Sequence, residues 1–426
     1  MDLRKASREE LAKLEAELLQ EYNACKEKGL KLDMSRGKPG ADQLDLSEAM
    51  LRVLAHNEDL IADGLDTRNY GVLDGIPACR ALFAELLGVP AKNIIAGGNA
   101  SLTMMYDNIM RLWVFGAPGC TPWSKQEKVK FLCPVPGYDR HFAICEQLGI
   151  EMINVPMLED GPDMNMVKQY VEGDATVKGI WCVPQYSNPE GKTYSDDVVR
   201  AFANLTPAAP DFRIMWDNAY CVHHLYEKQD HVLNLFTELE KTDKLDMLFM
   251  FASTSKISYP GAGVAVMVCS DANIAWTKKI MGVQAIGPDK INQLRHVRFF
   301  GNAEGVAMHM QRHAAILAPK FDVVLETLER RIGGTGAGTW HKPAGGYFVS
   351  FDAMPGCASK IYELCKEAGL VITGAGATFP YGKDANDSNL RIAPSFPTTE
   401  ELKVAINLFC TCALLAACRK CMAEIA

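Results

Sequence analysis

The sequence predicts an α/β protein with a large domain built on a mostly parallel sheet, followed by a smaller α+β domain. Three observations predict this fold class. Between residues 70 and 300, short apolar runs alternate with helical patterns, as in a sheet covered by helices. After residue 300 the alternation stops, and a long helical pattern leads into a few strands and a final helix. The length of 426 residues is too great for one small core and suggests two or three domains.

The first element is an amphipathic helix over residues 7–28. Ser7 and Glu10 match a capping box, and large apolar side chains then recur at helical spacing up to Gly29. The following stretch is irregular, with its glycine and proline concentrated in RGKPG (36–40). We therefore expect an extended arm between this helix and the large domain.

The large domain is predicted from apolar runs that read as buried strands, separated by helical patterns. The strands are expected in NIIAGG (93–98), VKFLCPVPG (129–137), EMINVPM (151–157), GIWCVP (179–184), RIMWDNAY (213–220), MLFMFAS (247–253) and VAVMVCS (264–270). The helices between them are expected in SLTMMYDNIMRLW (101–113), YDRHFAICEQLG (138–149), DMNMVKQYVEG (163–173) and SDDVVRAFANL (195–205).

A long helix over residues 303–332 leads into the smaller domain, which ends with another helix over 398–425. Strands are expected between them in GGYFVSFD (345–352), LVITGAG (370–376) and NLRIAPS (389–395). We divide the chain into an N-terminal helix and arm that pack with the small domain (1–48), the large domain (49–310) and the small domain (311–426).

Charge and composition exclude several classes of protein. The net charge of −8 and a pI near 5.7 argue against nucleic-acid binding, because no basic stripe exists to contact phosphates. No apolar run appears long enough to span a membrane, and the N-terminus has no signal-peptide pattern. Fourteen cysteines in such a chain are expected to be reduced thiols, so we predict a cytoplasmic protein.

Four of the cysteines, Cys410, Cys412, Cys418 and Cys421, could be interpreted as zinc ligands. They lie in one predicted helix, which holds Cys418 and Cys421 on one face but points Cys412 elsewhere. The loop that structural zinc sites use is also missing. We therefore predict no metal, and cysteines that pack as small apolar residues.

The residues that carry chemistry follow predicted strands. Lys256 can form a Schiff base, and the carboxylate of Asp217 can keep a pyridine nitrogen protonated. Asn188 and Tyr220 can hydrogen-bond a phenolic oxygen. A phosphate can bind at the turn of Asn99, Ala100 and Ser101, which opens a helix, and at Ser253 and Ser255. Each residue alone is weak evidence, but together they describe pyridoxal 5′-phosphate, held at one edge of the sheet.

The chain also resembles the fold-type I, class I aminotransferases, which are pyridoxal-phosphate enzymes, over roughly residues 30–415. The resemblance rests on YGVLDG (70–75), GGNAS (97–101), PGYDR (136–140), SNPEG (187–191), DNAY (217–220), STSK (253–256) and LRIAPS (390–395). It implies that Tyr138 stacks on the cofactor ring and that Arg391 binds the substrate α-carboxylate. It also implies a homodimer with active sites at the interface, where Tyr70 reaches the phosphate of the neighbouring subunit.

Other details, such as SRGKPG and PGAGVA, are most similar to a divergent bacterial aspartate aminotransferase subgroup related to the MocR-type regulators. A regulator would add a basic winged-helix domain, and residues 1–30 are too short and too acidic for one. The sequence departs from the family at Gly263, where most class I enzymes carry an arginine that pairs with the phosphate. We therefore expect amides, hydroxyls and a helix N-terminus to hold the phosphate.

We predict an aminotransferase that moves an amino group between an L-amino acid, aspartate or glutamate, and a 2-oxo acid. Lys256, Asp217 and Tyr220 are the expected catalytic residues. A β-elimination lyase acting on C–S bonds is the alternative on the same fold. A dicarboxylic substrate needs a second cation besides Arg391. The candidates are Arg36 and Lys38, which flank Gly37 in the arm, where Gly37 would offer a backbone contact, and Lys290, expected from across the subunit interface.

Overall fold

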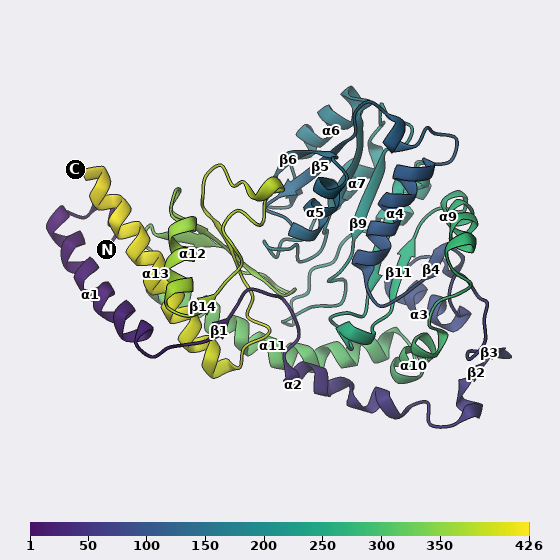
Figure 1. Cartoon of the computed structure of the whole chain (residues 1–426), viewed down its shortest axis with the longest axis horizontal. Helices are drawn as coiled ribbons and strands as arrows, with labels where there is room; N and C mark the ends of the chain where they lie inside the picture. The colour runs from purple at the N-terminus through teal and green to yellow at the C-terminus, as the bar shows by residue number, and fades with distance from the viewer. Residues whose placement is uncertain (426) are drawn as a thin grey trace.

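The computed structural model describes residues 1–425 and has two lobes, with both termini in the smaller one (Figure 1). An eight-stranded sheet forms the large lobe, in the order β4-β11-β10-β9-β8-β5-β6-β7. The central strands from β10 to β6 are parallel, whereas β11 and β7 are antiparallel to their neighbours. The strands are β4 (Ile94–Ala96), β5 (Lys130–Val135), β6 (Glu151–Leu158), β7 (Gly161–Pro162), β8 (Val177–Cys182), β9 (Arg213–Asp217), β10 (Leu248–Ser253) and β11 (Ala265–Val268).

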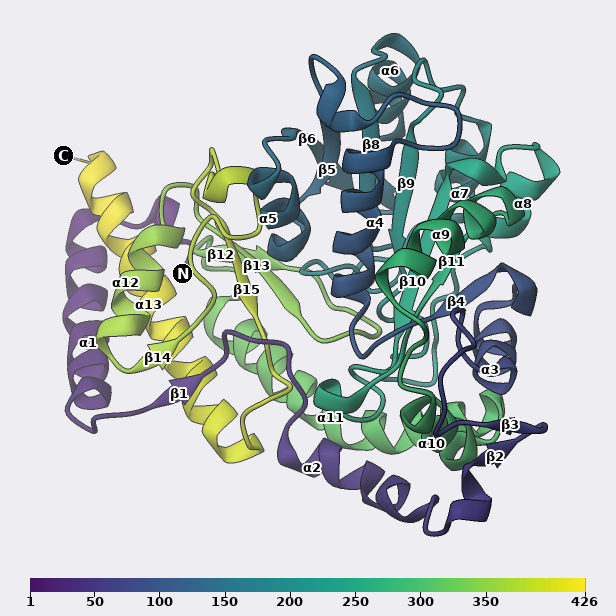
Figure 2. The same ribbon diagram turned by 45° about the vertical axis from the view of Figure 1, so that its right-hand side comes forward.

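Both faces of the sheet are covered by helices (Figure 2). Alternate strand residues point to opposite faces, so Ile214 and Trp216 join one apolar cluster while Met215 joins the other. The first cluster includes α3 (Pro77–Leu87), α6 (Met164–Gly173), α7 (Asp196–Asn204), α8 (Leu235–Lys241) and α10 (Lys290–Phe300). The second includes α4 (Ser101–Phe115), α5 (Asp139–Gln147) and α9 (Asp271–Gln284).

The small lobe contains a three-stranded antiparallel sheet in the order β12-β13-β15. The capping box at Ser7 and Glu10 starts its first helix as predicted. A short parallel pair, β1 with β14, joins the N-terminal segment to this lobe. Its elements are α1 (Arg8–Lys26), β1 (Leu32–Asp33), β12 (Gly338–Trp340), β13 (Val349–Ala353), α12 (Ala358–Glu367), β14 (Leu370–Val371), β15 (Asn389–Ile392) and α13 (Thr399–Ile425).

The long helix α11 (Ala303–Ile332) connects the two lobes. Val306 and Met310 in its first half pack with residues of α3 and α10, whereas Leu317 to Ile332 enter the core of the small lobe. Our boundary at residue 310 therefore falls within a continuous helix, and the division into domains stays a prediction.

Helix α13 corrects one expectation from the sequence. It contains an 18-residue window of mean hydropathy 1.7, which is long and apolar enough to cross a membrane by length and composition. The structure buries 78% of that window inside the protein, between α1, α11 and α12. This window of the helix is strongly apolar because it lies in the core of the small lobe.

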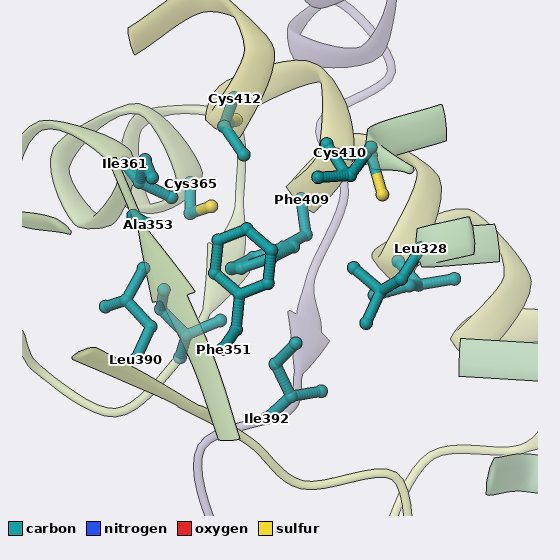
Figure 3. Close-up of a cluster of buried hydrophobic side chains, with 14 of the residues drawn as sticks. Leu328, Phe351, Ala353, Ile361, Cys365, Leu390, Ile392, Phe409, Cys410 and Cys412 are labelled. Carbon is teal, nitrogen blue, oxygen red and sulfur yellow. The ribbon is translucent and has the colours of Figure 1, made fainter. Parts of the chain in front are cut away.

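The four cysteines of α13 are buried in this core. Cys410 and Cys412 lie around the contact between Phe351 and Phe409, whose rings meet edge to face at 5.1 Å (Figure 3). Among residues 1–425 no group of three or more potential metal ligands is found. The cysteines therefore pack as small apolar side chains.

The sequence did not predict the short helix α2 (Ala41–Leu44) in the arm, nor the hairpin of β2 (Ile61–Ala62) and β3 (Leu65–Asp66) that follows the arm. The predicted α/β fold class is otherwise confirmed, and every predicted strand of the large domain is present. The parallel strands β8, β9 and β10 end at the same edge of the sheet, which faces the small lobe and positions the site.

Candidate active site

A cavity of about 610 Å³ lies at the carboxyl edge of the sheet, between the two lobes. Its walls come from the arm, the first residues of α4 and α5, and the ends of the central strands. The small lobe closes it with Phe348, the segment Ile372–Gly374 and Arg391 on β15. Segments far apart in the chain therefore meet around one space.

Lys256 lies three residues beyond β10, and its side chain enters the cavity. Its Nζ lies 4.9 Å from the ring centre of Tyr220 and 5.9 Å from that of Tyr347. Burial lowers the pKa of this amine, and Arg391 adds to the effect, while Asp217 opposes it. A lowered pKa raises the fraction of free amine, which is the form that attacks an aldehyde.

Asp217 is the last residue of β9 and is buried beside the cavity. Its Oδ2 lies 3.1 Å from Nε2 of His141, and the His141 ring stacks on Trp181 with centroids 4.4 Å apart. Its Oδ1 has no hydrogen-bond partner within residues 1–425. A buried carboxylate oxygen without a partner is costly, so this atom has free capacity for a ligand donor such as a protonated ring nitrogen.

The turn after β4 leads directly into α4, and Ala100 and Ser101 at this helix N-terminus line the cavity. Ser253 and Ser255 line the cavity beside this turn, with their hydroxyl oxygens 3.1 Å apart. The Ser255 hydroxyl also donates to the carbonyl oxygen of Asn99 at 3.3 Å. Backbone amides, hydroxyls and a helix N-terminus meet here, which is the chemistry that binds a phosphate.

Gly263 packs against the same turn. A Cβ atom there would lie 3.0 Å from the Asn99 carbonyl oxygen, 3.2 Å from Thr254 Oγ1 and 3.3 Å from the Tyr259 carbonyl oxygen. A side chain at this position would press on the backbone that shapes the phosphate turn. A side chain at position 263 would therefore need these neighbours to shift by a few tenths of an ångström, whereas glycine fits without a shift.

Arg391 is buried and holds two groups of the large lobe. Its Nη1 donates to Oδ1 of Asp139 at 3.0 Å and to Oδ1 of Asn188 at 3.2 Å. The guanidinium carbon lies 4.8 Å from the ring centre of Phe348, and Nε has no partner among the described residues. The group is fixed in place and still has donors for a carboxylate.

Two aromatic side chains complete the wall. The Tyr138 ring meets His141 edge to face at 4.9 Å, next to the His141 contact with Asp217. Burial raises the pKa of the Tyr138 phenol to about 12. Burial also raises the pKa of Tyr220, which therefore stays a neutral hydrogen-bond donor.

The arm places three of the predicted residues at the cavity, Arg36, Gly37 and Lys38. A Cβ atom on Gly37 would overlap the Phe348 ring, so the arm backbone lies directly on that ring. The ammonium of Lys38 lies 3.7 Å from the ring centre of Phe396. Lys38 is therefore engaged by an aromatic face, whereas Arg36 is exposed.

Three predicted residues lie outside this cavity. Tyr70 and Lys290 line a separate hollow of about 580 Å³, where Tyr70 is 80% exposed and Lys290 Nζ donates to the Gly71 carbonyl oxygen at 3.1 Å. Asn99 lines a smaller cavity behind the phosphate turn. The roles assigned to all these residues stay predictions, and those of Tyr70 and Lys290 require a partner subunit.

Several residues around the site were not predicted: Asp139, Arg140 and Phe348 line the cavity, and His141 contacts Asp217 beside it. The available signal was PGYDRH, in which three polar residues follow Tyr138 directly. This stretch contributed to the prediction only through its resemblance to the aminotransferases. Polar side chains at the start of a helix that follows a strand are well placed to contact a ligand. Asp139, Arg140 and His141 were therefore candidate site residues.

The residues fit pyridoxal 5′-phosphate. A lysine with a lowered pKa, an unpartnered carboxylate oxygen, and a turn with amides and hydroxyls surround one cavity in a large lobe of mixed, mostly parallel sheet. Fold and site together define a pyridoxal-phosphate enzyme of fold type I.

Comparison with known proteins identifies the family. The model of the aspartate amino-transferase family matches residues 6–424, and the chain belongs to this family. An aspartate aminotransferase of Corynebacterium glutamicum is 48% identical over 402 residues, which cover 94% of this chain and 93% of the relative. A Mycolicibacterium smegmatis protein, provisionally named as an aminotransferase, is 51% identical over 93% of each chain.

A solved structure has the same fold. The aspartate transaminase from Corynebacterium glutamicum superposes with a TM-score of 0.96 and 46% identity, and the match covers 99% of each chain. The protein is therefore a fold-type I aminotransferase that uses pyridoxal phosphate, as the sequence predicted.

Proposed function

We propose that the enzyme exchanges amino groups between aspartate or glutamate and the corresponding 2-oxo acids, oxaloacetate and 2-oxoglutarate. The observation that carries this proposal is the charge on the cavity wall. Five cationic side chains line it, and only two carboxylates, Asp139 and Asp217, oppose them. The cations are Arg36, Lys38, Arg140, Lys256 and Arg391. Such a wall favours a substrate with two carboxylates.

Bound pyridoxal phosphate supplies an electron sink for the bond at the substrate Cα. Arg391 orients the substrate through its α-carboxylate, with Asn188 and Phe348 fixing the guanidinium. With the cofactor bound, Lys256 would be the residue that holds it covalently, and its Nζ would serve as the base for the proton at the substrate Cα, because its pKa is lowered. Asp217 Oδ1, which has no partner among residues 1–425, would keep the ring nitrogen of the cofactor protonated, and His141 holds the carboxylate in place.

The proposal includes a homodimer in the cytoplasm. Tyr70 is mostly exposed, and Val283 and Ile286 nearby are 93% and 62% exposed. Large apolar side chains with this much exposure support an interface that a second copy of the chain would cover. In such a dimer Tyr70 and Lys290 would serve the partner's cavity. The division at residues 48 and 310 is part of the same proposal, with the cavity between the large and small domains.

The test measures kcat/KM for aspartate, glutamate, alanine and an aromatic amino acid, each with 2-oxoglutarate and with pyruvate. We expect dicarboxylic pairs to exceed the others by at least about 100-fold, the scale expected when a pocket pairs its charges. A preference for alanine or aromatic substrates would overturn the substrate proposal. Release of ammonia and a keto acid without a second keto acid would instead indicate the lyase, which the relatives do not favour.

Charge-neutral variants at Arg36 and Lys290 complete this test. We expect Arg36→Gln and Lys290→Gln to raise KM for dicarboxylic substrates far more than for alanine, because each removes a charge that the distal carboxylate would meet. An equal effect on alanine would assign the residue a structural role.

A further inference from the structure

The turn that carries Lys256 lies outside regular secondary structure. Strand β10 ends at Ser253, and the residues from Thr254 to Ser258 form bends and turns. Inside the turn, the backbone amides of Ile257 and Ser258 both donate to the Thr254 carbonyl oxygen at 2.9 Å. Such a turn is less rigid than a strand, so the position of a side chain on it depends on what holds the turn in place.

Three side chains form a closed triangle of short contacts across this turn. The hydroxyl oxygens of Thr254 and Ser258, two residues before and two residues after Lys256, lie 3.1 Å apart. Nε2 of His296 on α10 lies 2.8 Å from the Ser258 oxygen and 3.2 Å from the Thr254 oxygen. The three side chains are buried. The imidazole therefore joins both ends of the turn that carries the lysine.

The other ring nitrogen fixes the tautomer of His296. Nδ1 lies 2.8 Å from the Asn292 carbonyl oxygen, which can only accept, so Nδ1 carries a proton. Burial lowers the pKa of His296 to about 4, so the ring is neutral at neutral pH and Nε2 is an acceptor. One hydroxyl of the triangle then donates to Nε2, and the other donates to the first hydroxyl. The Val264 amide completes the arrangement by donating to Thr254 Oγ1 at 2.9 Å.

The buried polar face of α10 also holds the loops beside the lysine turn. Asn292 Nδ2 donates to the carbonyl oxygens of Ala262 and Gly263 at 3.0 and 2.8 Å. Gln293 Nε2 donates to the carbonyl oxygen of Gly97, in the turn after β4, at 3.3 Å. One helix therefore connects the lysine turn with the turn where we expect the phosphate, and it sets their relative position.

We infer that His296 is a positioning residue for Lys256. It holds the turn so that Nζ of the lysine stays in the cavity, 4.9 Å from the ring centre of Tyr220. It acts through Thr254 and Ser258 rather than on the substrate. The inference rests on Lys256 as the residue that holds the cofactor, and it is independent of which amino acid the enzyme prefers.

His296→Leu tests this role because it keeps a buried side chain and removes both ring nitrogens. We expect kcat to fall by about 10- to 100-fold, since a misplacement of about 1 Å can cost catalysis about 100-fold. KM for the amino acid should change by less than about 3-fold, because Arg391 on β15 is untouched. His296→Gln should recover part of the loss, because its side-chain oxygen can accept from the two hydroxyls.

A measurement on the apoenzyme separates position from turnover. Reductive methylation with formaldehyde and cyanoborohydride, followed against pH by mass spectrometry of the peptide that contains Lys256, reports the pKa of its amine. Burial lowers that pKa in the unmutated chain, and the charges of Asp217 and Arg391 are unchanged in the variant. A loosened turn admits water, so we expect the labelling midpoint of His296→Leu to rise by about 1 pH unit.

Two further variants decide whether the triangle carries the effect. Leu294→Ala is the matched control, since Leu294 is buried on the same helix but joins an apolar cluster. It should lower the melting temperature without changing kcat or the labelling midpoint. Ser258→Ala removes one corner of the triangle. Added to His296→Leu, it should cause little further loss, because the two changes break the same contact.

The outcomes are distinguishable. A folded His296→Leu with the kcat and labelling midpoint of the unmutated enzyme overturns the inference, and so do effects that Leu294→Ala reproduces, because these reflect stability alone. If His296→Leu does not fold, Ser258→Ala decides: a smaller shift in the same direction supports the role, and no shift overturns it. Turnover retained by Lys256→Ala would instead overturn the catalytic assignment of the lysine, and the inference with it.

Discussion

Nη1 of Arg391 lies 3.0 Å from Oδ1 of Asp139, so the guanidinium that is expected to bind substrate already holds a carboxylate of the chain itself. The two residues belong to different lobes, one on β15 and the other at the start of α5. Their contact therefore helps to hold the cavity between the lobes in the form described here. A substrate α-carboxylate has to share the guanidinium with Asp139 or displace it.

This contact leads to a prediction for Asp139→Asn. The change keeps the size of the side chain and removes its charge, so the competition for Arg391 weakens. We expect KM for amino acids to fall by about 3- to 10-fold, equally for aspartate and alanine, because a partly exposed ion pair is worth about 1 kcal/mol. Steady-state kinetics with both substrates checks this, and a rise in KM for both would mean that Asp139 orients Arg391 for substrate.

The second prediction concerns Lys256→Ala. The variant should stay folded and lose multiple-turnover transamination, because no other amine replaces Nζ at the substrate Cα. Borohydride treatment of the holoenzyme should attach the cofactor to the peptide that contains Lys256, and mass spectrometry should find no such peptide in the variant. Lys38→Ala is the control, since Lys38 also lines the cavity but lies over Phe396. Turnover retained by Lys256→Ala would contradict the assignment.

The third prediction concerns Asp217→Ala. Removal of the carboxylate leaves the ring nitrogen of the cofactor without its partner and leaves His141 Nε2 unpaired in a buried place. We expect weaker cofactor binding and a loss of several orders of magnitude in kcat, as for other losses of electrostatic stabilisation. Equilibrium dialysis against the cofactor and single-turnover kinetics measure the two effects separately. Turnover near that of the unmutated enzyme would show that another group keeps the nitrogen protonated.

The strands and the residues that follow them were predictable because both depend on local pattern. Runs such as MLFMFAS are apolar on both faces, and Asp217 and Lys256 follow such runs directly. Helix α10 was missed because Asn292, Gln293 and His296 are buried polar residues, which break the apolar periodicity of a helix. Their hydrogen bonds to distant segments, such as that from Gln293 to the Ala96 carbonyl oxygen at the end of β4, exist only in the folded chain.

The surroundings of α13 and the contact of Arg391 with Asp139 could not be predicted from the sequence, for a related reason. An all-apolar helix is the same in sequence whether protein or lipid surrounds it, and only the packing of α13 decides between the two. Asp139 and Arg391 are 252 positions apart, so no spacing rule connects them. Local patterns thus predicted most of the residues that line the cavity, while the contacts that orient them required the tertiary structure.

The last prediction concerns Gly263, where the family arginine is missing. Although an arginine would add a positive charge near the phosphate, we expect Gly263→Arg to weaken cofactor binding. The reason is steric, because even a Cβ atom would meet the Asn99 carbonyl oxygen at 3.0 Å and so press on the turn whose amides bind the phosphate. Gly263→Ala should show the same direction with a smaller effect, about 3- to 10-fold in the cofactor dissociation constant, because each displaced hydrogen bond costs about 1 kcal/mol.

Gly261→Ala is the matched control, since a Cβ atom at Gly261 meets nothing within 4 Å in the same loop. Its cofactor dissociation constant, measured by fluorescence titration of the apoenzyme, should equal that of the unmutated chain. Tighter cofactor binding by Gly263→Arg would mean that the turn can move aside. The attraction between the arginine and the phosphate would then outweigh the steric cost. In that case the phosphate site would be short of a positive charge, and the backbone of the turn would not fully replace the arginine.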